Sequence, residues 1–230
     1  MPLALRVNRR LRESSHVKIH LLPSGPLMTN GCLLTDAQLG QAVLVDAPEG
    51  ITELIQPRLA QEGCKLVELW LTHGHWDHMQ EAARVKRDTG VIVRAHRADQ
   101  AFIETPAVQE GWMGRELGLE GVKVDAWVVH GQHLKALGRD FEVRHVPGHC
   151  AGSVLFYLAE KKLALVGDTL FAGGVGRTDF PGCSAEQLQQ SIREQIYTLP
   201  DDTVVVPGHG PHTAVGIEKE TNPYVTANVP

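Results

Sequence analysis

The segment LTHGHWDH places three histidines and one aspartate within six residues. One residue separates His73 from His75, and Asp77 and His78 follow closely. Imidazole and carboxylate groups are the usual protein ligands of zinc and similar divalent metals. The alternative interpretation is a solvated turn, because His, Asp and Gly are all common in turns. The density of the cluster favours a metal-binding turn.

Three more segments place a single histidine or aspartate just after an apolar, strand-like run. They are RHVPGHCAGS with His149, LALVGDTLF with Asp168 and TVVVPGHGP with His209. A strand that runs into a polar, glycine-containing loop is a usual position for binding groups in α/β proteins, because the scaffold fixes the loop. Four strand ends of this kind in one chain predict a shared metal site rather than scattered turns.

The seven candidate ligands exceed the four of a closed structural zinc site. We therefore expect two metals that share one carboxylate, with an open position for water at each metal. The expected assignment gives His73, His75 and His149 to the first metal, Asp77, His78 and His209 to the second, and Asp168 to both. Two ions held roughly 3.5–4 Å apart generate a bridging hydroxide near neutral pH and polarise a carbonyl. The pattern predicts a binuclear hydrolase of acyl or ester bonds, with Asp77 and Asp168 as candidate catalytic residues.

Short apolar runs and helical segments alternate along the chain and must position these side chains. Strands are predicted for 16–22, 30–36, 41–47, 66–72 and 91–96, and again for the runs VDAWVV, HLKAL, FEVRHV, SVLFYL, KLALVG and TVVVPG. Helices are predicted for 51–63, 79–90 and 185–197, and the segment 105–121 is either a loop or a helix hairpin. Two β-rich halves with their own helices predict two sheets packed face to face with helices outside, in one domain that spans 1–230.

Composition narrows the class of partner. The chain is 43% hydrophobic and 21% charged with a net charge of -5, which is ordinary for a globular protein and lacks the basic stripe of a nucleic-acid binder. No apolar run approaches the roughly 18 residues of a membrane span. The arginine-rich start is interpreted as a ragged N-terminus rather than an organelle-targeting peptide. Four widely spread cysteines without a C-x-x-C pair indicate a reducing, cytoplasmic setting.

The motif set resembles the metallo-β-lactamase superfamily. The residues that carry the resemblance are THGHWDH, His149 in PGHCAGS, Asp168 in GDTLF and His209 in PGHG, and they extend over nearly the whole chain. The resemblance implies an α/β fold, a four-layer αβ/βα sandwich of two mixed sheets with outer helices. Within it, GDTLFAGGVGRTDFPG, the long run that ends in PGHGPHT, and EKETNPYV resemble the short, single-domain glyoxalase II-like hydrolases of bacteria. That likeness implies a small-molecule thioester substrate of the S-lactoylglutathione (hydroxyacylglutathione) type and two divalent ions, for which we expect zinc, with iron or manganese as alternatives.

Some positions have supporting roles or depart from the family pattern. Asp46 matches a superfamily position that supports the metal loop through hydrogen bonds, and a plain turn aspartate is the alternative. Arg177 is a candidate substrate-binding residue for a carboxylate, although pairing with Asp179 to brace the loop is slightly favoured. Full-length glyoxalase II proteins carry a C-terminal helical domain that contacts glutathione, and this chain ends about twenty residues after His209. The glutathione-binding residues and the oligomeric state are therefore not predicted.

Two other functions remain as alternatives. A mononuclear iron persulfide dioxygenase of the same superfamily would share GRTDF and the NP motif and would use His73, His149 and Asp168 as its iron ligands. The PGHGP sequence at His209 favours the hydrolase, because the dioxygenases tend to carry Ala-His-Asp-Tyr there. A non-catalytic metal-binding protein is disfavoured, because such proteins usually lack a ligand and here the set is complete. Nucleic-acid processing and β-lactam cleavage are weaker predictions.

Overall fold

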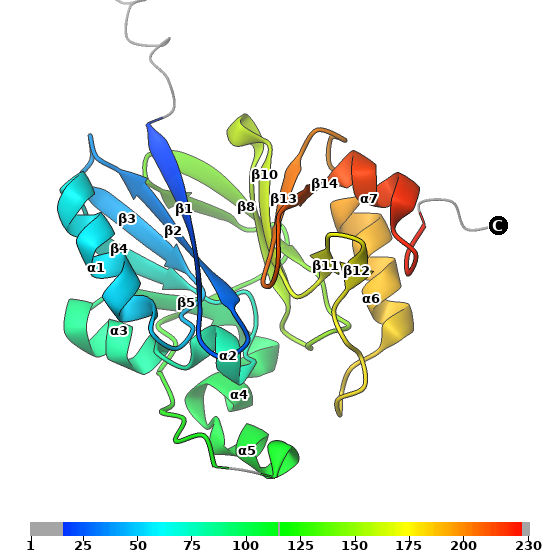
Figure 1. The fold of residues 1–230 in the computed structure, drawn as a ribbon, viewed down its shortest axis with the longest axis horizontal. Helices are drawn as coiled ribbons and strands as arrows, with labels where there is room; N and C mark the ends of the chain where they lie inside the picture. The colour runs from blue at the N-terminus through cyan, green and yellow to red at the C-terminus, as the bar shows by residue number, and fades with distance from the viewer. Residues whose placement is uncertain (1–15, 115, 227–230) are drawn as a thin grey trace, which may run out of the picture.

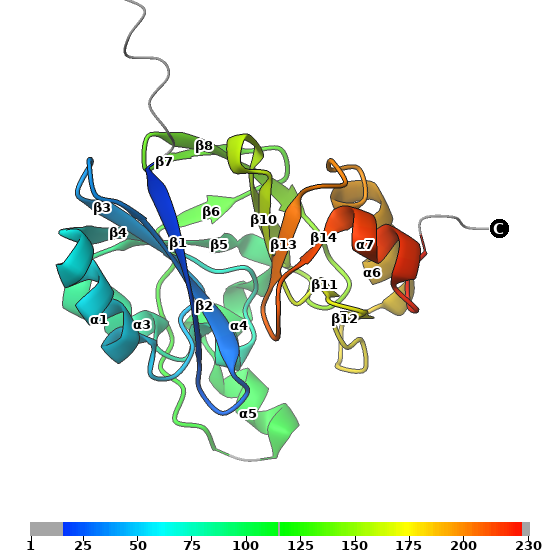
Figure 2. The same cartoon turned by 45° about the horizontal axis from the view of Figure 1, so that its top comes forward.

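The computed structural model describes residues 16–114 and 116–226 of the protein. Two six-stranded sheets face each other, with strand orders β1-β2-β3-β4-β5-β6 and β14-β13-β10-β9-β8-β7. Figures 1 and 2 show α1 and α3 on the outer side of the first sheet and α6 and α7 on the outer side of the second. The two sheets and their outer helices confirm the predicted αβ/βα sandwich. The assignment of the whole chain to one domain stays a prediction, because it includes residues outside the described ranges.

The first sheet contains β1 (Val17–Ser24), β2 (Thr29–Asp36), β3 (Gln41–Val45), β4 (Lys65–Trp70), β5 (Ile92–His96) and β6 (Ala126–Val128). The second sheet contains β7 (His133–Ala136), β8 (Arg139–His145), β9 (Val154–Leu158), β10 (Leu163–Gly167), β13 (Val204–Pro207) and β14 (Thr213–Ala214). A small hairpin is formed by β11 (Leu170–Phe171) and β12 (Gly174–Val175). Both large sheets combine parallel and antiparallel pairs, as expected.

The helices are α1 (Ile51–Glu62), α2 (Trp76–Met79), α3 (Ala82–Thr89), α4 (Gln100–Glu104), α5 (Ala107–Met113), α6 (Ala185–Ser191) and α7 (Val215–Thr221). Three further turns are helical: η1 (Arg97–Asp99), η2 (Ala159–Lys161) and η3 (Ile192–Ile196), the last of which continues α6. The Ser184 side chain caps α6 by accepting from the Gln187 N–H, so this helix begins where it was predicted. Among the described residues, no helix has the length and apolar character needed to cross a membrane.

The helix predicted for 79–90 is wrong in its bounds, because two helices, α2 and α3, occupy this region and the first starts earlier. The Ala47 N–H donates to the His78 carbonyl at 2.7 Å, and the Glu81 N–H donates to the Ala47 carbonyl at 2.9 Å. These backbone groups would pair within a continuous helix, but the loop after β3 uses them instead. The break lets α2 present its side chains at the end of β4 while α3 packs against the sheet.

Other elements were left open or missed by the sequence pattern. The segment 105–121 contains α5 followed by irregular chain, and both views place α5 at one end of the molecule beside α4. The sequence pattern predicts neither the hairpin β11–β12 nor α7. Both are too short for a periodic apolar pattern to identify them.

The core between the sheets is centred on Trp70 at the end of β4. Its ring packs edge-on against Phe141, with centroids 5.0 Å apart. It also packs against the tilted ring of Phe156, with centroids 4.9 Å apart. All three side chains are fully buried, and the two phenylalanines come from β8 and β9 of the opposite sheet. Since β4 leads directly into the HGHWDH segment, this aromatic cluster fixes the strand end from which the candidate ligands project.

We expect replacement of Phe156 by alanine to lower the free energy of unfolding by about 3–5 kcal/mol, because the change leaves a cavity between the two sheets. Leu54→Ala on the exposed side of α1 is the control, with an expected effect within about 0.5 kcal/mol. Equilibrium unfolding in urea measures both values. Equal effects of the two substitutions would show that the aromatic cluster does not hold the sheets together.

Candidate metal centre

The seven predicted ligands meet at one edge of the sandwich. His73 and His75 follow β4, Asp77 and His78 lie on α2, and the other three follow β8, β10 and β13. In each of three sets of residues, the ligand atoms lie within 4.8 Å of one another: His73, His75 and His149; His73, His78 and Asp168; and Asp77, His78 and His209. The first and third sets match the two expected metal sites except for the shared Asp168, which falls in the second set.

The Asp168 carboxylate lies between the two expected sites. Its Oδ1 is 3.2 Å from His78 Nε2, and its Oδ2 is 3.4 Å from His209 Nε2 and 3.7 Å from His149 Nε2. One carboxylate therefore faces imidazoles of both sets, as a shared ligand must.

Buried polar atoms without partners test whether the site fits metal ions. His78 Nε2, His149 Nε2 and Asp168 Oδ1 are buried, and none of them makes a well-aligned hydrogen bond among the described residues, although His78 Nε2 and Asp168 Oδ1 lie 3.2 Å apart. Leaving such an atom unsatisfied costs about 1–3 kcal/mol, and divalent cations are the partners that imidazole and carboxylate groups prefer. The donor set fits divalent ions.

The outer nitrogens of the candidate ligands are held by protein groups. His78 Nδ1 lies 2.8 Å from Asp46 Oδ2, His149 Nδ1 lies 2.8 Å from the Arg177 carbonyl, and His209 Nδ1 lies 3.0 Å from the Leu27 carbonyl. A carbonyl only accepts, so His149 and His209 must donate from Nδ1, which leaves their Nε2 lone pairs for a metal when the rings are neutral. Such partners fix ring orientation and raise the basicity of the ligand.

Asp46 supports both the histidine ligands and the loop that carries them. Besides facing His78, its carboxylate accepts from the backbone N–H and the hydroxyl of Thr72, both at 2.8 Å. The Thr72 hydroxyl in turn lies 3.1 Å from His73 Nδ1. Asp46 is 2% exposed, so these contacts match the supporting role better than the plain turn aspartate.

Different ring nitrogens of His73 and His75 face the same point. His73 Nε2 lies 3.1 Å from His75 Nδ1. Side chains at i and i+2 leave the backbone at different angles, which is why the far nitrogen of one ring meets the near nitrogen of the other. If both residues held one ion, His73 Nε2 and His75 Nδ1 would be the nitrogens available to it.

Glycines at two positions make room for the cluster. A Cβ atom on Gly208 would overlap Asp168 Oδ1 and lie 2.5 Å from His78 Cε1. A Cβ on Gly176 would overlap the Asp168 carbonyl and lie 3.0 Å from the His149 ring. The glycine that precedes His209 in PGHG is therefore required sterically by the site itself.

The electrostatics of the cluster are set by burial and by mutual contacts. Burial and the neighbouring His149 lower the pKa of His75 to about 3. Burial opposes ionisation of Asp77, yet the charge of His78 and the hydrogen bond from His209 lower the pKa of Asp77 to about 2. Burial likewise opposes protonation of His209, but its hydrogen bonds with Asp168 and Asp77 raise its pKa to about 10. A protonated His209 carries its additional proton on Nε2, which is the atom that would bind an ion.

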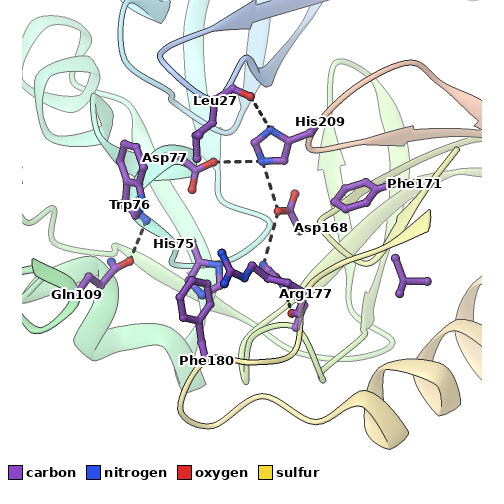
Figure 3. A pocket seen from close by; sticks show the side chains of 12 residues that line it. Leu27, His75, Trp76, Asp77, Gln109, Asp168, Phe171, Arg177, Phe180 and His209 are labelled. Carbon is purple, nitrogen blue, oxygen red and sulfur yellow. Dashed lines mark hydrogen bonds and ion pairs between the residues drawn. The ribbon is translucent and has the colours of Figure 1, made fainter. Parts of the chain in front are cut away.

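A cavity of about 590 Å³ opens onto the cluster. Figure 3 shows Trp76 and Gln109 on one side of it, Phe171 on the other, and Arg177 with Phe180 along a third wall. The walls formed by residues other than the candidate ligands are Leu27, Trp76, Gln109, Phe171, Val175, Arg177 and Phe180. Most of these side chains are apolar, so the cavity presents the ligand cluster as its main polar surface.

Arg177 both lines this cavity and braces its own loop. Its Nε and Nη2 each donate to the Asp179 carboxylate at 2.7 Å, and its guanidinium lies 4.1 Å from the centre of the Phe180 ring. The bracing that the sequence favoured is therefore present. Because Asp179 uses the Nε and Nη2 edge, the Nη1 edge is left for a substrate group, and that role stays a prediction.

Gln109 on α5 is a supporting residue that the sequence pattern missed. Its Oε1 accepts from the Trp76 N–H at 2.9 Å, and its Nε2 donates to the carbonyls of Gly74 and Phe102 at 2.9 and 3.1 Å. It lies in a segment without apolar periodicity, 33 residues from Trp76. No local signal could connect the two.

Thr29 and Asn30 support the ligands from the first sheet. The Thr29 hydroxyl donates to Asp77 Oδ2 at 2.8 Å, and Asn30 Nδ2 donates to the carbonyls of Pro207 and Gly210, each at 3.0 Å, on either side of His209. Both side chains are buried at the start of β2, where amide and hydroxyl groups need specific partners. In the sequence, the only signal for this role is two adjacent polar residues at the start of a predicted strand.

The closing NP motif supports the cavity wall. Asn222 donates to the Gly174 carbonyl at 3.1 Å and to Glu218 Oε2 at 2.8 Å, and Glu218 Oε2 also accepts from the Gly173 N–H at 3.0 Å. These bonds hold the turn of the β11–β12 hairpin, whose Phe171 and Val175 reach the cavity.

We expect metal binding to release protons and to strengthen as pH rises. His209 with a pKa of about 10 is protonated at pH 7.5 and must lose that proton before Nε2 can bind an ion. Calorimetric titration of metal-free protein with Zn²⁺ in two buffers of different ionisation enthalpy measures the protons released per ion. His209→Ala should release fewer protons at pH 7.5, whereas the exposed His133→Ala should release as many as the unchanged protein.

Comparisons with known proteins agree with this geometry. The model of the metallo-beta-lactamase superfamily matches residues 25–209. A relative from Haemophilus influenzae named hydroxyacylglutathione hydrolase GloC is 35% identical over 213 residues, which cover 92% of this chain and 99% of the relative. The range matched by the family model includes the positions of all seven candidate ligands.

Two solved structures are similar in fold and sequence. The crystal structure of the BLEG-1 B3 metallo-beta-lactamase has a TM-score of 0.83 and 32% identity, covering 91% of this chain and 100% of the other. That of TTHA1623 in a di-iron-bound form has a TM-score of 0.79 and 32% identity, covering 90% and 100%. With the family model and the His/Asp cluster, they lead to one conclusion: this chain is a metallohydrolase that belongs to the metallo-beta-lactamase superfamily.

Proposed function

We propose that the protein hydrolyses thioesters of the S-lactoylglutathione type. The observation that carries the proposal is the complete set of seven ligand residues, with buried, unpartnered nitrogen and oxygen atoms directed into one cluster beside an open cavity. The 35% identity to a hydroxyacylglutathione hydrolase supports this choice of substrate over other acyl compounds.

Two divalent ions are proposed as the cofactors, with zinc as the first choice and iron or manganese as alternatives. The proposed holders are His73, His75 and His149 for one ion, Asp77, His78 and His209 for the other, and Asp168 for both. When bound, the ions would activate a water near neutral pH and polarise the thioester carbonyl. The di-iron form of the similar protein TTHA1623 supports iron as the main alternative.

The protein's own groups hold the two candidate catalytic carboxylates in place. Asp77 is held by the Thr29 hydroxyl and Asp168 by its close packing against Gly208 and Gly176, so both carboxylates keep their positions during turnover. A thiol has a pKa of about 8.5, so a departing thiolate needs little help from a protein acid. This fits a cavity whose walls, apart from the candidate ligands, carry no acidic side chain among the described residues.

Substrate binding is proposed to use the apolar walls and one cation. Trp76, Phe171 and Phe180 present apolar surface to the acyl group and the thiol arm. Arg177 is the one arginine or lysine among the described residues that line the cavity, and its Nη1 edge would take a substrate carboxylate.

A cytoplasmic setting is also proposed. The four cysteines form no disulfide among the described residues, which fits a reducing compartment.

The mononuclear iron persulfide dioxygenase remains the second candidate, because GRTDF and the NP motif are shared with that branch. The structure gives both motifs roles in the cavity wall, which either reaction could use. All seven candidate ligands are retained in that branch too, so the sets of ligand atoms do not separate the two reactions. The PGHGP sequence at His209 is what favours the hydrolase.

We expect the zinc-loaded protein to hydrolyse S-lactoylglutathione. Asp46→Asn removes an outer partner of the ligands and should lower kcat/KM by about 10–100-fold. Asp168→Asn removes a proposed ligand and should lower kcat/KM by more than Asp46→Asn does. Thioester loss, metal content and oxygen uptake are measured in parallel on zinc-, iron- and manganese-loaded protein, with a β-lactam as a further substrate. No thioester turnover with full metal would contradict the proposal. Oxygen uptake with glutathione persulfide by the iron form would establish the dioxygenase instead.

A further inference from the structure

Asp99 is a buried carboxylate outside the ligand set, at the end of η1 behind the metal centre. It is 1% exposed. Its Oδ2 accepts from the Gly74 N–H at 2.8 Å, its Oδ1 accepts from the Gly152 N–H at 2.6 Å, and Cys150 Sγ lies 3.1 Å from both oxygens. Three donors from two distant loops therefore converge on one carboxylate.

The two loops joined by Asp99 carry one set of ligands. Gly74 separates His73 from His75 at the end of β4, and Cys150 directly follows His149 in the loop between β8 and β9. One loop belongs to the first sheet and the other to the second. Asp99 thus ties the two halves of the sandwich together at the point where their histidines must meet.

The backbone at Gly152 and Gly74 packs tightly against the Asp99 side chain. A Cβ on Gly152 would lie 2.5 Å from Asp99 Cγ, and one on Gly74 would lie 3.0 Å from Asp99 Cβ. Burying a carboxylate is costly unless each oxygen is hydrogen-bonded, and here each oxygen has a backbone N–H and a share of the thiol. The Gly74 carbonyl is held from the opposite side by Gln109, so the peptide between the two histidines has a fixed orientation.

We propose that Asp99 is a positioning residue that holds the His73–His75 turn against the His149 loop and so retains the ion bound by these three histidines. The inference rests on the proposed metal centre and not on the identity of the substrate. Asparagine at this position has one acceptor oxygen, and its amide N–H₂ would face a backbone N–H, so one of the two loops would be released.

Asp99→Asn should lose one ion to a chelator about 10–100 times faster than the unchanged protein, the size of effect expected for outer partners of metal ligands. The thiol of Cys150 should become open to iodoacetamide, as read by peptide mass spectrometry. With a thioester substrate, kcat should fall while KM stays within about twofold, because the cavity walls are unchanged. Unchanged metal release and a protected Cys150 would overturn the proposal.

Asp36→Asn is the control for the same substitution at a buried aspartate away from the metal centre. Asp36 Oδ1 accepts from the backbone N–H groups of Gln38 and Leu39, and the residue lies at the far end of β2 from Thr29. Because one oxygen takes both bonds, asparagine can keep them, so this variant tests the loss of a buried charge alone. Its metal release and Cys150 protection should match the unchanged protein. Equal acceleration of metal release in both variants would show a general loss of stability and would overturn the positioning role.

A second pair of variants tests the same contact if Asp99→Asn does not fold. Cys150→Ser keeps a donor for the carboxylate and Cys150→Ala removes it, so the alanine variant should release one ion about fivefold faster than the serine variant. Equal rates would overturn the proposal. The chelator and alkylation measurements need no substrate. They therefore test the role of Asp99 even if the protein does not hydrolyse thioesters.

Discussion

The constraint on which this structure depends is the desolvation of seven titratable side chains at the junction of two sheets. Most of them are buried, and several of their nitrogen and oxygen atoms have no partner in the described part of the chain. Hydrogen bonds with Asp168 and Asp77 raise the pKa of His209 to about 10, so protons compete with cations for this cluster. The fold must supply enough packing and hydrogen bonding to keep such a cluster assembled.

That support is arranged in an outer layer of contacts drawn from both halves of the molecule. Asp46 fixes Thr72 and His78, the Leu27 and Arg177 carbonyls fix His209 and His149, and Asp99 joins the loops on which the histidines lie. The aromatic cluster around Trp70 holds the strand that feeds the first ligands. Packing and polar contacts thus act on the same strand ends.

The cavity has a different character from the cluster at its base. Its walls come from the β1–β2 turn, α2, α5 and the chain from β11 to Phe180, and the polar groups of Arg177 and Gln109 are largely engaged in holding those walls. Substrate selection would therefore depend on apolar shape and on one free edge of a guanidinium, whereas the chemistry belongs to the cluster.

The sequence by itself determined the candidate ligands, most strands of the two large sheets, the helices that begin at Ile51 and Ala185, and the family, because residue type, spacing and strand-end position are local signals. HGHWDH and three later strand ends sufficed for all seven residues. It did not predict the break after α2, the Gln109 contact or the Asp99 bridge, which depend on pairs 25 to 53 residues apart. Only the tertiary structure decided these, because hydrogen bonds between distant loops form where packed sheets bring them together and leave no periodic trace in the chain.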